Sequence, residues 1–526
     1  MRNIIITCIV LLIAIAALAA KYFGELASND NNFGKVLSYV PGDAAFVLNF
    51  RNDESFYEIF KDYELFDAII GEQRASEIDR LKTALLQQNS LSEFVADKDI
   101  LLSFHPGADS VEFLYGLLID KSLSSKKLEE ALAEIPGTSL KAEGQDIYKV
   151  EGPDLQKPFY LFSRGGIVMG SFSNSLLKRC LDRNETHLTR EFIAEVNKNN
   201  SKNENSPVSL FVNHQAVIPF LQYFLRQPSS NNLSLLKNLS GTSSLSMNFK
   251  SDALMFNGIS ITDTIKPSYL NIFLNQQSAP NQIKKILPEN TASFIAFGLS
   301  DFNRFNSDLK RYLQKKGDLK KLTEQFNLVQ TNTGIDLDRD IKPLFDKEFV
   351  LVENSYGEQF AIIKARNGRD LNFKLQLISR PLDEFISQVN HRNIFYFYFG
   401  DPMYRFPKPY FAVADNYLII ANTPGIIRNY LSGYQNNRFF ANTEKFKQHD
   451  QLVANRSNIF YFADNKNSKN LIRTKFKNNV SKAFRNEDFG LSEFKGISYQ
   501  WTADGDHFFT NLYLSYNSSD SLALNP

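Results

Sequence analysis

Val40-Pro41-Gly42-Asp43-Ala44-Ala45-Phe46-Val47, near the start of the chain, reads like Leu287-Pro288-Glu289-Asn290-Thr291-Ala292-Ser293-Phe294-Ile295, near its middle. In both stretches a proline and a short polar turn lead into an apolar run, the pattern of a strand that begins after a turn. Such repetition sets the architecture before any single residue is interpreted.

Other stretches repeat in the same order at nearly the same separation. The pairs are Asp97-Lys98-Asp99-Ile100-Leu101-Leu102 with Asp346-Lys347-Glu348-Phe349-Val350-Leu351, Lys157-Pro158-Phe159 with Lys408-Pro409-Tyr410, and Gly241 with Gly496. The four separations are 247, 249, 251 and 255 residues, a slow drift in one direction. A duplication with small insertions would leave this pattern. We therefore predict a first repeat over residues 36–262 and a second over 283–516.

Each predicted repeat contains strands joined by short turns, with helices standing between groups of strands. Short turns require antiparallel pairing, and segregated helices indicate an α+β fold. The predicted fold is therefore two tandem pseudo-repeats, each an antiparallel sheet with helices packed on it, after an N-terminal membrane helix. The predicted helices include 55–88, 126–134 and 381–389, and the predicted strands include 394–399. Residues 196–207 are predicted to form an exposed Asn-rich loop. Residues 264–284 are predicted to form a linker, in which 269–273 could form a strand.

Bulk composition limits the possible classes of function. The 526 residues suit two to four domains, and 43% hydrophobic and 22% charged residues are ordinary for a globular protein. A net charge of +1 provides no general basic field for nucleic acid. The 46 phenylalanines predict aromatic-rich cores.

The N-terminus carries an almost unbroken apolar run, Ile4 to Ala20, between Arg2 and Lys21. Seventeen residues span roughly 26 Å as a helix, close to the thickness of a bilayer core. We favour an uncleaved anchor over residues 1–24, with the body outside the cytoplasm, so we expect a single-pass inner-membrane protein with a periplasmic body. A cleaved signal ending at Ala17-Leu18-Ala19 and a lipoprotein built on Cys8 are the alternatives.

The chain resembles, over most of both repeats, the bacterial family catalogued as domain of unknown function 3352. The resemblance is carried by Gly334-Ile335-Asp336-Leu337, Asp340, Pro343-Leu344-Phe345 and Glu348-Phe349-Val350. The first repeat keeps only Leu91-Ser92-Glu93-Phe94 before Asp97-Lys98-Asp99-Ile100. The resemblance implies an extracytoplasmic protein of unassigned role and supplies no catalytic residue.

Each sequence motif that could bind an ion or a phosphate also has a structural interpretation. Asp336, Asp338 and Asp340 match the first ligands of a calcium loop, but Ile341 and Lys347 stand where glycine and glutamate are required. We therefore interpret the segment as the start of a helix. Ser163-Arg164-Gly165-Gly166 lacks the Lys-Ser/Thr of a phosphate loop and is interpreted as a hairpin turn.

The histidines show no metal-ligand spacing. They are His105, His187, His214, His391, His449 and His507. We interpret His105, which precedes Pro106-Gly107, as a turn residue, and His507, after Asp504-Gly505-Asp506, as part of a hairpin. Cys180 is expected to be buried on a helix.

Two local runs could face a partner. Lys466 to Arg485 carries basic residues and no acidic one, and is interpreted as a solvated helix face, with an anionic lipid or polymer site as the alternative. Phe395-Tyr396-Phe397-Tyr398-Phe399 is interpreted as core, with an exposed partner face as the alternative.

We therefore assign no catalytic, cofactor-binding or metal-ligating residue and no cofactor, and expect no enzymatic activity. The expected function is a binding or structural module of the cell envelope. Its expected partners are the membrane, through the N-terminal helix, and envelope proteins or lipid, but not nucleic acid. A periplasmic lipid-carrying or chaperone-like protein is the alternative, and it would need a continuous apolar cleft.

Overall fold

The computed structural model of the chain separates into two compact units, residues 1–62 with 76–212 (unit 1) and residues 63–75 with 213–526 (unit 2). The residues that the structure describes are 33–52, 80, 83, 88–96, 98–107, 111–119, 125–135, 137–142, 146–153, 155–200, 206, 208–227, 235–236, 238–250, 253–478 and 494–516. The predicted membrane segment 1–24 and nearly all of the predicted helix over 55–88 lie outside these ranges. No helix within them is long and apolar enough to cross a membrane.

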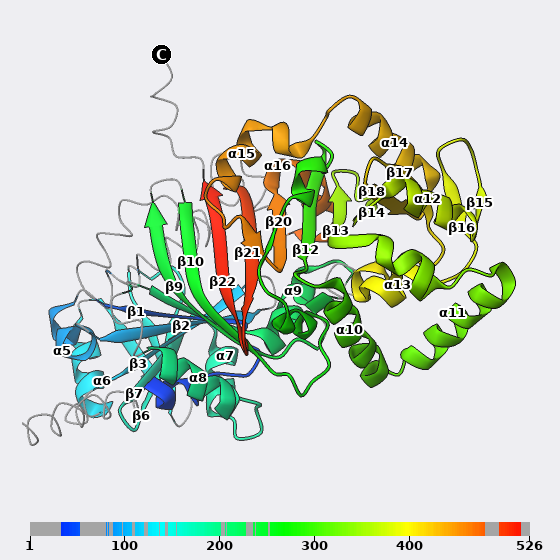
Figure 1. Cartoon of the computed structure of the whole chain (residues 1–526). Helices are drawn as coiled ribbons and strands as arrows, with labels where there is room; N and C mark the ends of the chain where they lie inside the picture. The colour runs from blue at the N-terminus through cyan, green and yellow to red at the C-terminus, as the bar shows by residue number, and fades with distance from the viewer. Residues whose placement is uncertain are drawn as a thin grey trace, which may run out of the picture. The chain divides into compact units, whose positions relative to one another are not determined.

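Unit 1 is built on one antiparallel sheet. Its strands pair in the order β8, β1, β2, β3, β7, β6, β5, β4. Of these, β1, β2, β3, β6 and β7 are labelled in Figure 1. Their bounds are β1 (Phe46–Arg51), β2 (Asp99–Pro106), β3 (Val111–Leu118), β4 (Ser139–Ala142), β5 (Tyr148–Glu151), β6 (Phe159–Arg164), β7 (Ile167–Ser171) and β8 (Val208–Asn213).

Both faces of this sheet are covered. Strand alternation sends Leu114 to one core and Tyr115 to the other. The first core is closed by α7 (Asn174–Leu181) and α8 (Arg190–Asn200), and the second by α5 (Ser92–Val95) and α6 (Ser125–Ala133). The α7 helix begins at Ser173, whose hydroxyl accepts the Leu176 N–H.

Unit 2 contains a longer antiparallel sheet, in the order β9, β10, β22, β21, β20, β12, β13, β14, β18, β17, β16, β15 (Figure 1). The strands of this sheet are β9 (Gly241–Lys250), β10 (Ala253–Thr262), β12 (Thr291–Gly298), β13 (Phe345–Asn354), β14 (Gln359–Ala365), β15 (Ser379–Pro381), β16 (Ser387–Val389), β17 (Tyr410–Ala414), β18 (Tyr417–Ala421), β20 (Ile459–Asp464), β21 (Phe494–Asp504) and β22 (His507–Tyr516).

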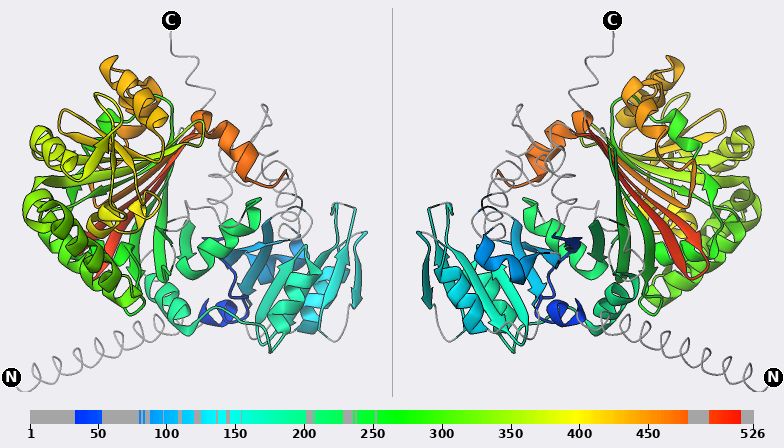
Figure 2. Two further views of the ribbon diagram at one scale, coloured as in Figure 1. Left: turned by 90° about the vertical axis from the view of Figure 1, so that its right-hand side faces the viewer. Right: turned by 90° about the vertical axis from the view of Figure 1, so that its left-hand side faces the viewer.

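The central strands of unit 2 are apolar on both faces, because each face carries a separate core. Phe349 faces one core and Val350 the other. The first core is covered by α10 (Phe302–Lys316), α11 (Leu319–Thr333), α12 (Gly368–Gln376) and α13 (Ile394–Phe399); α10 and α11 lie along one side of the sheet (Figure 2). The second is covered by α14 (Pro424–Gln435) and α15 (Glu444–Asp450). Two further helices, α9 (His214–Phe224) and α16 (Asn465–Lys475), also belong to this unit.

The prediction of an α+β fold with antiparallel pairing is confirmed. The predicted helix over 126–134 is α6, and the hairpins predicted around Gly165-Gly166 and Asp504-Gly505-Asp506 join β6 to β7 and β21 to β22. The pattern succeeded there because local turn chemistry and strand alternation agree with the global fold.

The predicted strand over 394–399 is wrong, because these residues form the helix α13. Aromatic residues favour strands when one face packs on a sheet. Here every side chain from Ile394 to Phe399 is buried, and a helical turn satisfies its backbone internally. The interpretation of the aromatic run as core is confirmed.

The predicted helix over 381–389 is also wrong. Residues 379–389 form the hairpin of β15 and β16, in which Ser379 pairs with Val389 and Pro381 with Ser387. Leu382, Phe385 and Ile386 follow helical spacing, but Asp383 folds the chain into a tight turn. The helix of this region lies earlier, at α12.

Two predicted connecting segments have more structure than expected. The Asn-rich loop over 196–207 overlaps α8, and Val196 is fully buried. Within the predicted linker, Leu270–Asn275 is a 3-10 helix rather than a strand, and Tyr269 and Phe273 are buried in the core of unit 2. In both places apolar side chains, rather than the polar residues around them, decide the conformation.

Candidate functional site

A buried histidine in unit 1 lies at the centre of a group of polar side chains. Because side chains two residues apart on a strand share a face, Ser103 and His105 lie side by side on β2. His105 Nε2 is 2.9 Å from Ser103 Oγ, and His105 Nδ1 is 2.7 Å from Asp43 Oδ1. The interpretation of His105 as a turn residue is therefore wrong: β2 continues to Pro106, and His105 pairs with Glu112 across the ladder.

Arg179 of α7 completes this group. Its guanidinium binds Asp43 Oδ2 at 2.9 Å and Glu185 Oε1 at 2.9 Å. Burial alone would raise the pKa of Asp43, but the hydrogen bond and charge of His105, together with the charge of Arg179, outweigh it and lower that pKa. The carboxylate therefore ties the turn before β1 to both β2 and α7.

The distances in this group match those of a Ser-His-Asp catalytic triad. In a catalytic triad the serine is accessible to substrate, whereas here the aspartate is the accessible member. Ser103 and His105 are fully buried, whereas Asp43 keeps 29% of its side chain exposed. A nucleophilic serine must reach a substrate, so this arrangement offers no attacking group. In the part of the chain that the structure describes, the group acts as a buried polar support for the sheet.

Two further histidines are buried in unit 2. His214 Nε2 lies 2.8 Å from Ser243 Oγ, and His449 lies between Ser515 Oγ at 3.0 Å and Ser498 Oγ at 2.9 Å. Burial lowers the pKa of each ring to about 3. Both rings are therefore neutral at physiological pH.

The remaining candidates from the sequence are Cys180, His187, His391 and His507. Cys180 is buried on α7 as predicted, and burial raises the pKa of its thiol to about 12. His187 is partly buried near the Cys180 carbonyl, and His391 is partly buried. His507 pairs with Asp506 at 2.9 Å in its hairpin. Among the described residues, no group of three or more His, Cys, Asp or Glu side chains is placed to hold a metal.

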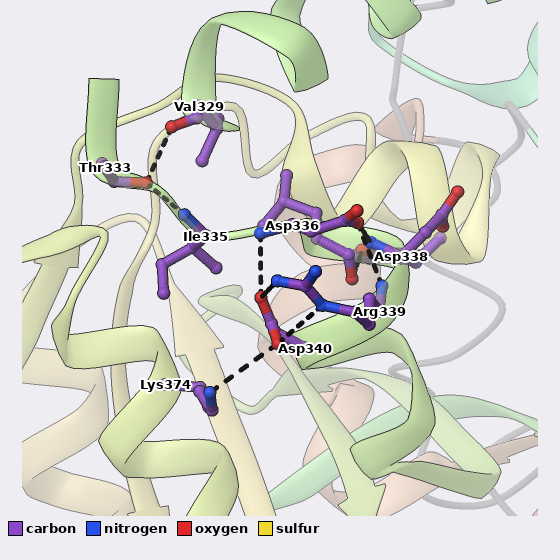
Figure 3. A network of polar contacts seen from close by, with 10 residues as sticks. Val329, Thr333, Ile335, Asp336, Asp338, Arg339, Asp340 and Lys374 are labelled. Atoms are coloured by element: carbon purple, nitrogen blue, oxygen red, sulfur yellow. Dashed lines mark hydrogen bonds and ion pairs between the residues drawn. The ribbon is translucent and has the colours of Figure 1, made fainter. Parts of the chain in front are cut away.

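The acidic segment after α11 is the helix start that its sequence predicts (Figure 3). Asp336 Oδ1 accepts the Asp338 N–H at 3.0 Å and the Arg339 N–H at 3.1 Å. Asp340 Oδ2 accepts the Asp336 N–H at 2.9 Å and pairs with Arg339, while Asp340 Oδ1 lies 3.8 Å from Lys374. The Arg339 hydrogen bond contributes most to lowering the pKa of Asp340. These carboxylates thus anchor the chain between α11 and β13.

The basic run from Lys466 to Arg485 agrees in part with the prediction of a solvated helix face. Its described portion is largely α16, which has no buried residue, as expected of a solvated face. Lys475 is an exception to full solvation, because it pairs with Glu353 of β13. Residues 479–485 of the run lie outside the described residues.

Four exposed apolar side chains that are near one another in the sequence of unit 2 are the strongest candidate for a binding site. They are Phe373 (63% exposed) and Leu377 (48%), at the end of α12, with Leu382 (49%) and Phe385 (63%), at the tip of the β15–β16 hairpin. We call these four side chains the apolar surface. A hydrogen bond from Ser387 Oγ to Gln376 Oε1, at 2.9 Å, joins α12 to the hairpin.

A rigid frame holds the tip of this surface. Asp383 Oδ1 accepts the N–H groups of Phe385 at 3.1 Å and Ile386 at 2.8 Å, and the Leu382 N–H donates to the Ile386 carbonyl at 2.8 Å. Arg428 of α14 binds Asp383 Oδ2 at 2.8 Å. The two exposed side chains therefore project from a turn with a fixed backbone.

Sequence reasoning missed both the His105 group and the apolar surface. A signal for the first was present, since Ser103-x-His105 alternates on a predicted strand, but its partner Asp43 is distant in sequence. The second gave a misleading signal, because its spacing imitates the buried face of a helix. Exposure depends on how far the hairpin extends beyond its neighbours, which spacing does not encode.

The chain belongs to the family described as "Protein of unknown function (DUF3352)", whose model matches residues 112–390. That match includes the apolar surface and the acidic segment of Figure 3. No curated protein matches the chain.

Solved structures that resemble the chain include crystal forms I, III and IV of TP0453. Form I has 12% sequence identity and a TM-score of 0.24, and the match covers 43% of this chain and 78% of that one. Form III has 14% identity, a TM-score of 0.23, and coverages of 46% and 87%. Form IV has 14% identity and a TM-score of 0.23, and the match covers 43% of this chain and 79% of that one. TM-scores this low support no conclusion about fold or function.

Proposed function

We propose that this protein is a non-catalytic binding module of the cell envelope, held at the inner membrane by residues 1–24 with its body outside the cytoplasm. The sequence supports the anchor through the run from Ile4 to Ala20, bounded by Arg2 and Lys21. The binding role rests chiefly on one observation, the apolar surface.

Large apolar side chains grouped on a surface mark interaction sites more often than isolated ones do. All four members of the apolar surface fall within residues 373–385, and each is about half or more exposed. Asp383 and Gln376 accept the hydrogen bonds that hold the turn and join it to α12, so little conformational freedom would be lost on binding. This combination favours a preformed contact surface.

The absence of catalysis is part of the proposal. The one described group with triad distances, Ser103-His105-Asp43, presents its acid rather than its nucleophile to solvent. Such a group strengthens a sheet without offering chemistry to a substrate.

We also propose that the body arose by duplication, with repeats at 36–262 and 283–516. The pairings β8–β1–β2–β3–β7–β6–β5–β4 have counterparts in β20–β12–β13–β14–β18–β17–β16–β15, in the same order. The pair Phe46–Val212 corresponds to Ser293–Ala463. Unrelated sheets would not share both order and register.

Connections outside the strands support the same proposal. Pro41 bridges His187, and Pro288 bridges Phe439. The Leu188 N–H donates to the Val40 carbonyl at 3.0 Å, and the Phe440 N–H donates to the Leu287 carbonyl at 2.8 Å. The opening motif quoted from the sequence is thus held in the same way in each proposed repeat.

Fractionation and protease accessibility test the location. The full chain should remain in the inner-membrane fraction after a high-salt wash, with its body digested only when protease reaches the periplasm. A chain lacking residues 1–24 should stay in the cytoplasm. Digestion of the body from the cytoplasmic side, or recovery of the full chain as a soluble protein, would refute the proposed anchor.

A further inference from the structure

We infer that the apolar surface of Phe373, Leu377, Leu382 and Phe385 binds the boundary between headgroups and acyl chains of a lipid bilayer. This inference rests on the proposed function, because it names the partner of the same surface. Three features favour lipid over a protein partner: the backbone of the tip, the charges around it, and the bilayer to which the proposed anchor would hold the chain.

The first feature is the hydrogen bonding of the turn. A segment that enters a bilayer interface must satisfy its own polar backbone groups, because lipid tails cannot. At the tip, the N–H groups of Leu382 and Asp383 donate to the Ile386 carbonyl, at 2.8 Å and 3.2 Å, and those of Phe385 and Ile386 donate to Asp383. Two large apolar side chains therefore project from a turn in which the N–H groups of residues 382, 383, 385 and 386 are bonded internally.

The second feature is the charge around the surface. The Asp383 carboxylate is paired with Arg428 and so does not stand alone at the tip. Arg380 donates to Gln388, and Gln388 donates to the carbonyl of Lys408, which places both cationic residues beside the hairpin. Arg380 and Lys408 are exposed and suited to lipid phosphates.

Arg369 of α12 adds an exposed cation, and two exposed acidic residues, Asp370 beside it and Glu384 at the tip, oppose the trend. Arg369 is exposed one helical turn before Phe373, on the same side of the helix. Glu384 is exposed at the tip and has no ion-pair partner among the described residues. A shallow contact follows, in which Leu382 and Phe385 reach the acyl boundary and Glu384 stays among headgroups.

The third feature is proximity. With residues 1–24 spanning a membrane as proposed, the bilayer is held at high effective concentration next to the body. A weak contact through two half-exposed side chains is then enough to orient the body. A protein partner would have to compete with this permanent neighbour.

The test places an environment-sensitive fluorophore on the full chain in liposomes containing phosphatidylethanolamine and phosphatidylglycerol. In a background of Cys8→Ala and Cys180→Ala, the label is attached at Phe385→Cys. The matched control is Tyr356→Cys, at an exposed turn of the same unit (80% exposed). We expect a blue shift, and quenching by brominated lipid tails, at position 385 but not at 356.

A second pair of variants uses the label at position 385. Leu382→Asn should reduce the lipid-quenched fraction by up to roughly tenfold, because it removes the burial of one leucine side chain from the contact. Glu384→Gln should increase that fraction, most strongly with anionic lipid. Circular dichroism of each variant checks that the fold is retained.

Emission at 385 that remains water-like, or equal quenching at 385 and 356, would overturn the lipid inference. A label that becomes shielded without lipid quenching would point to a second copy or another protein, and would also overturn it. The proposed binding function would survive that last outcome, since the surface would still be occupied. Failure of the anchor is detected separately by the fractionation experiment.

Discussion

The stability of unit 2 should fall steeply in mild acid, because His214 and His449 are buried in their neutral form. An unfolded histidine has a pKa of about 6.5. Burial lowers the folded pKa of each ring to about 3. The unfolded chain therefore binds protons that the folded unit excludes, and stability is lost as the pH falls below about 6.5.

The magnitude follows from linkage. Between about pH 6.5 and the folded pKa, each neutral histidine costs about 1.4 kcal/mol per pH unit. From about pH 7 to about pH 5 this amounts to about 2 kcal/mol for each ring, and about 4 kcal/mol for the two together. A loss of that size is a large fraction of the stability of an ordinary domain.

The chain contains its own probe for this measurement. Trp501, the single tryptophan, is buried on β21 in unit 2, and its ring lies 5.6 Å from that of His214. Urea unfolding followed by tryptophan fluorescence therefore reports on unit 2. Glutamine in place of His449 should remove about half of the pH dependence. Equal slopes for the wild type and His449→Gln would refute the reasoning.

Three further predictions concern individual contacts. His105→Ala should destabilise unit 1 by about 1–3 kcal/mol, because the buried Ser103 hydroxyl loses its hydrogen-bond partner. Amide exchange in β2 measures this destabilisation, and unchanged protection would contradict the prediction. Gly258→Ala should lower the free energy of unfolding by about 3 kcal/mol, because the new Cβ would lie 2.0 Å from a carbonyl oxygen of β9. The control Gly425→Ala, whose Cβ would meet nothing within 4 Å, should be nearly neutral. Similar urea midpoints for the two variants would contradict this prediction. Asp383→Ala should speed amide exchange in its turn roughly tenfold without changing global unfolding, and unaltered exchange would show that the carboxylate does not hold the turn.

Much of the fold can be predicted from the sequence, because local and tertiary preferences agree over most of the strands. The hairpin around Gly165-Gly166 is an example, since both its turn residues and its flanking apolar runs favour one conformation. Prediction fails where tertiary packing overrides local preference. Residues 394–399 have strand propensity yet are enclosed on all sides, and a helix is the form that satisfies their backbone there.

Prediction of the candidate site fails for a different reason. Sequence patterns show which side chains share a face, but not whether that face is covered. Leu382 and Phe385 have the spacing of buried helix residues and are exposed at a hairpin tip. Conversely, His105 looks like a polar turn residue and is fully buried, because Asp43 satisfies its ring from a distant part of the chain.

Photo-crosslinking in intact cells tests the central claim, that the apolar surface is a contact surface in the envelope. A benzophenone amino acid would replace Phe385 or, as the matched control, Tyr356. We expect adducts in the membrane fraction from position 385, reduced by Leu382→Asn, and none above background from position 356. Equal adduct yields at the two positions, or no adduct at 385, would contradict it.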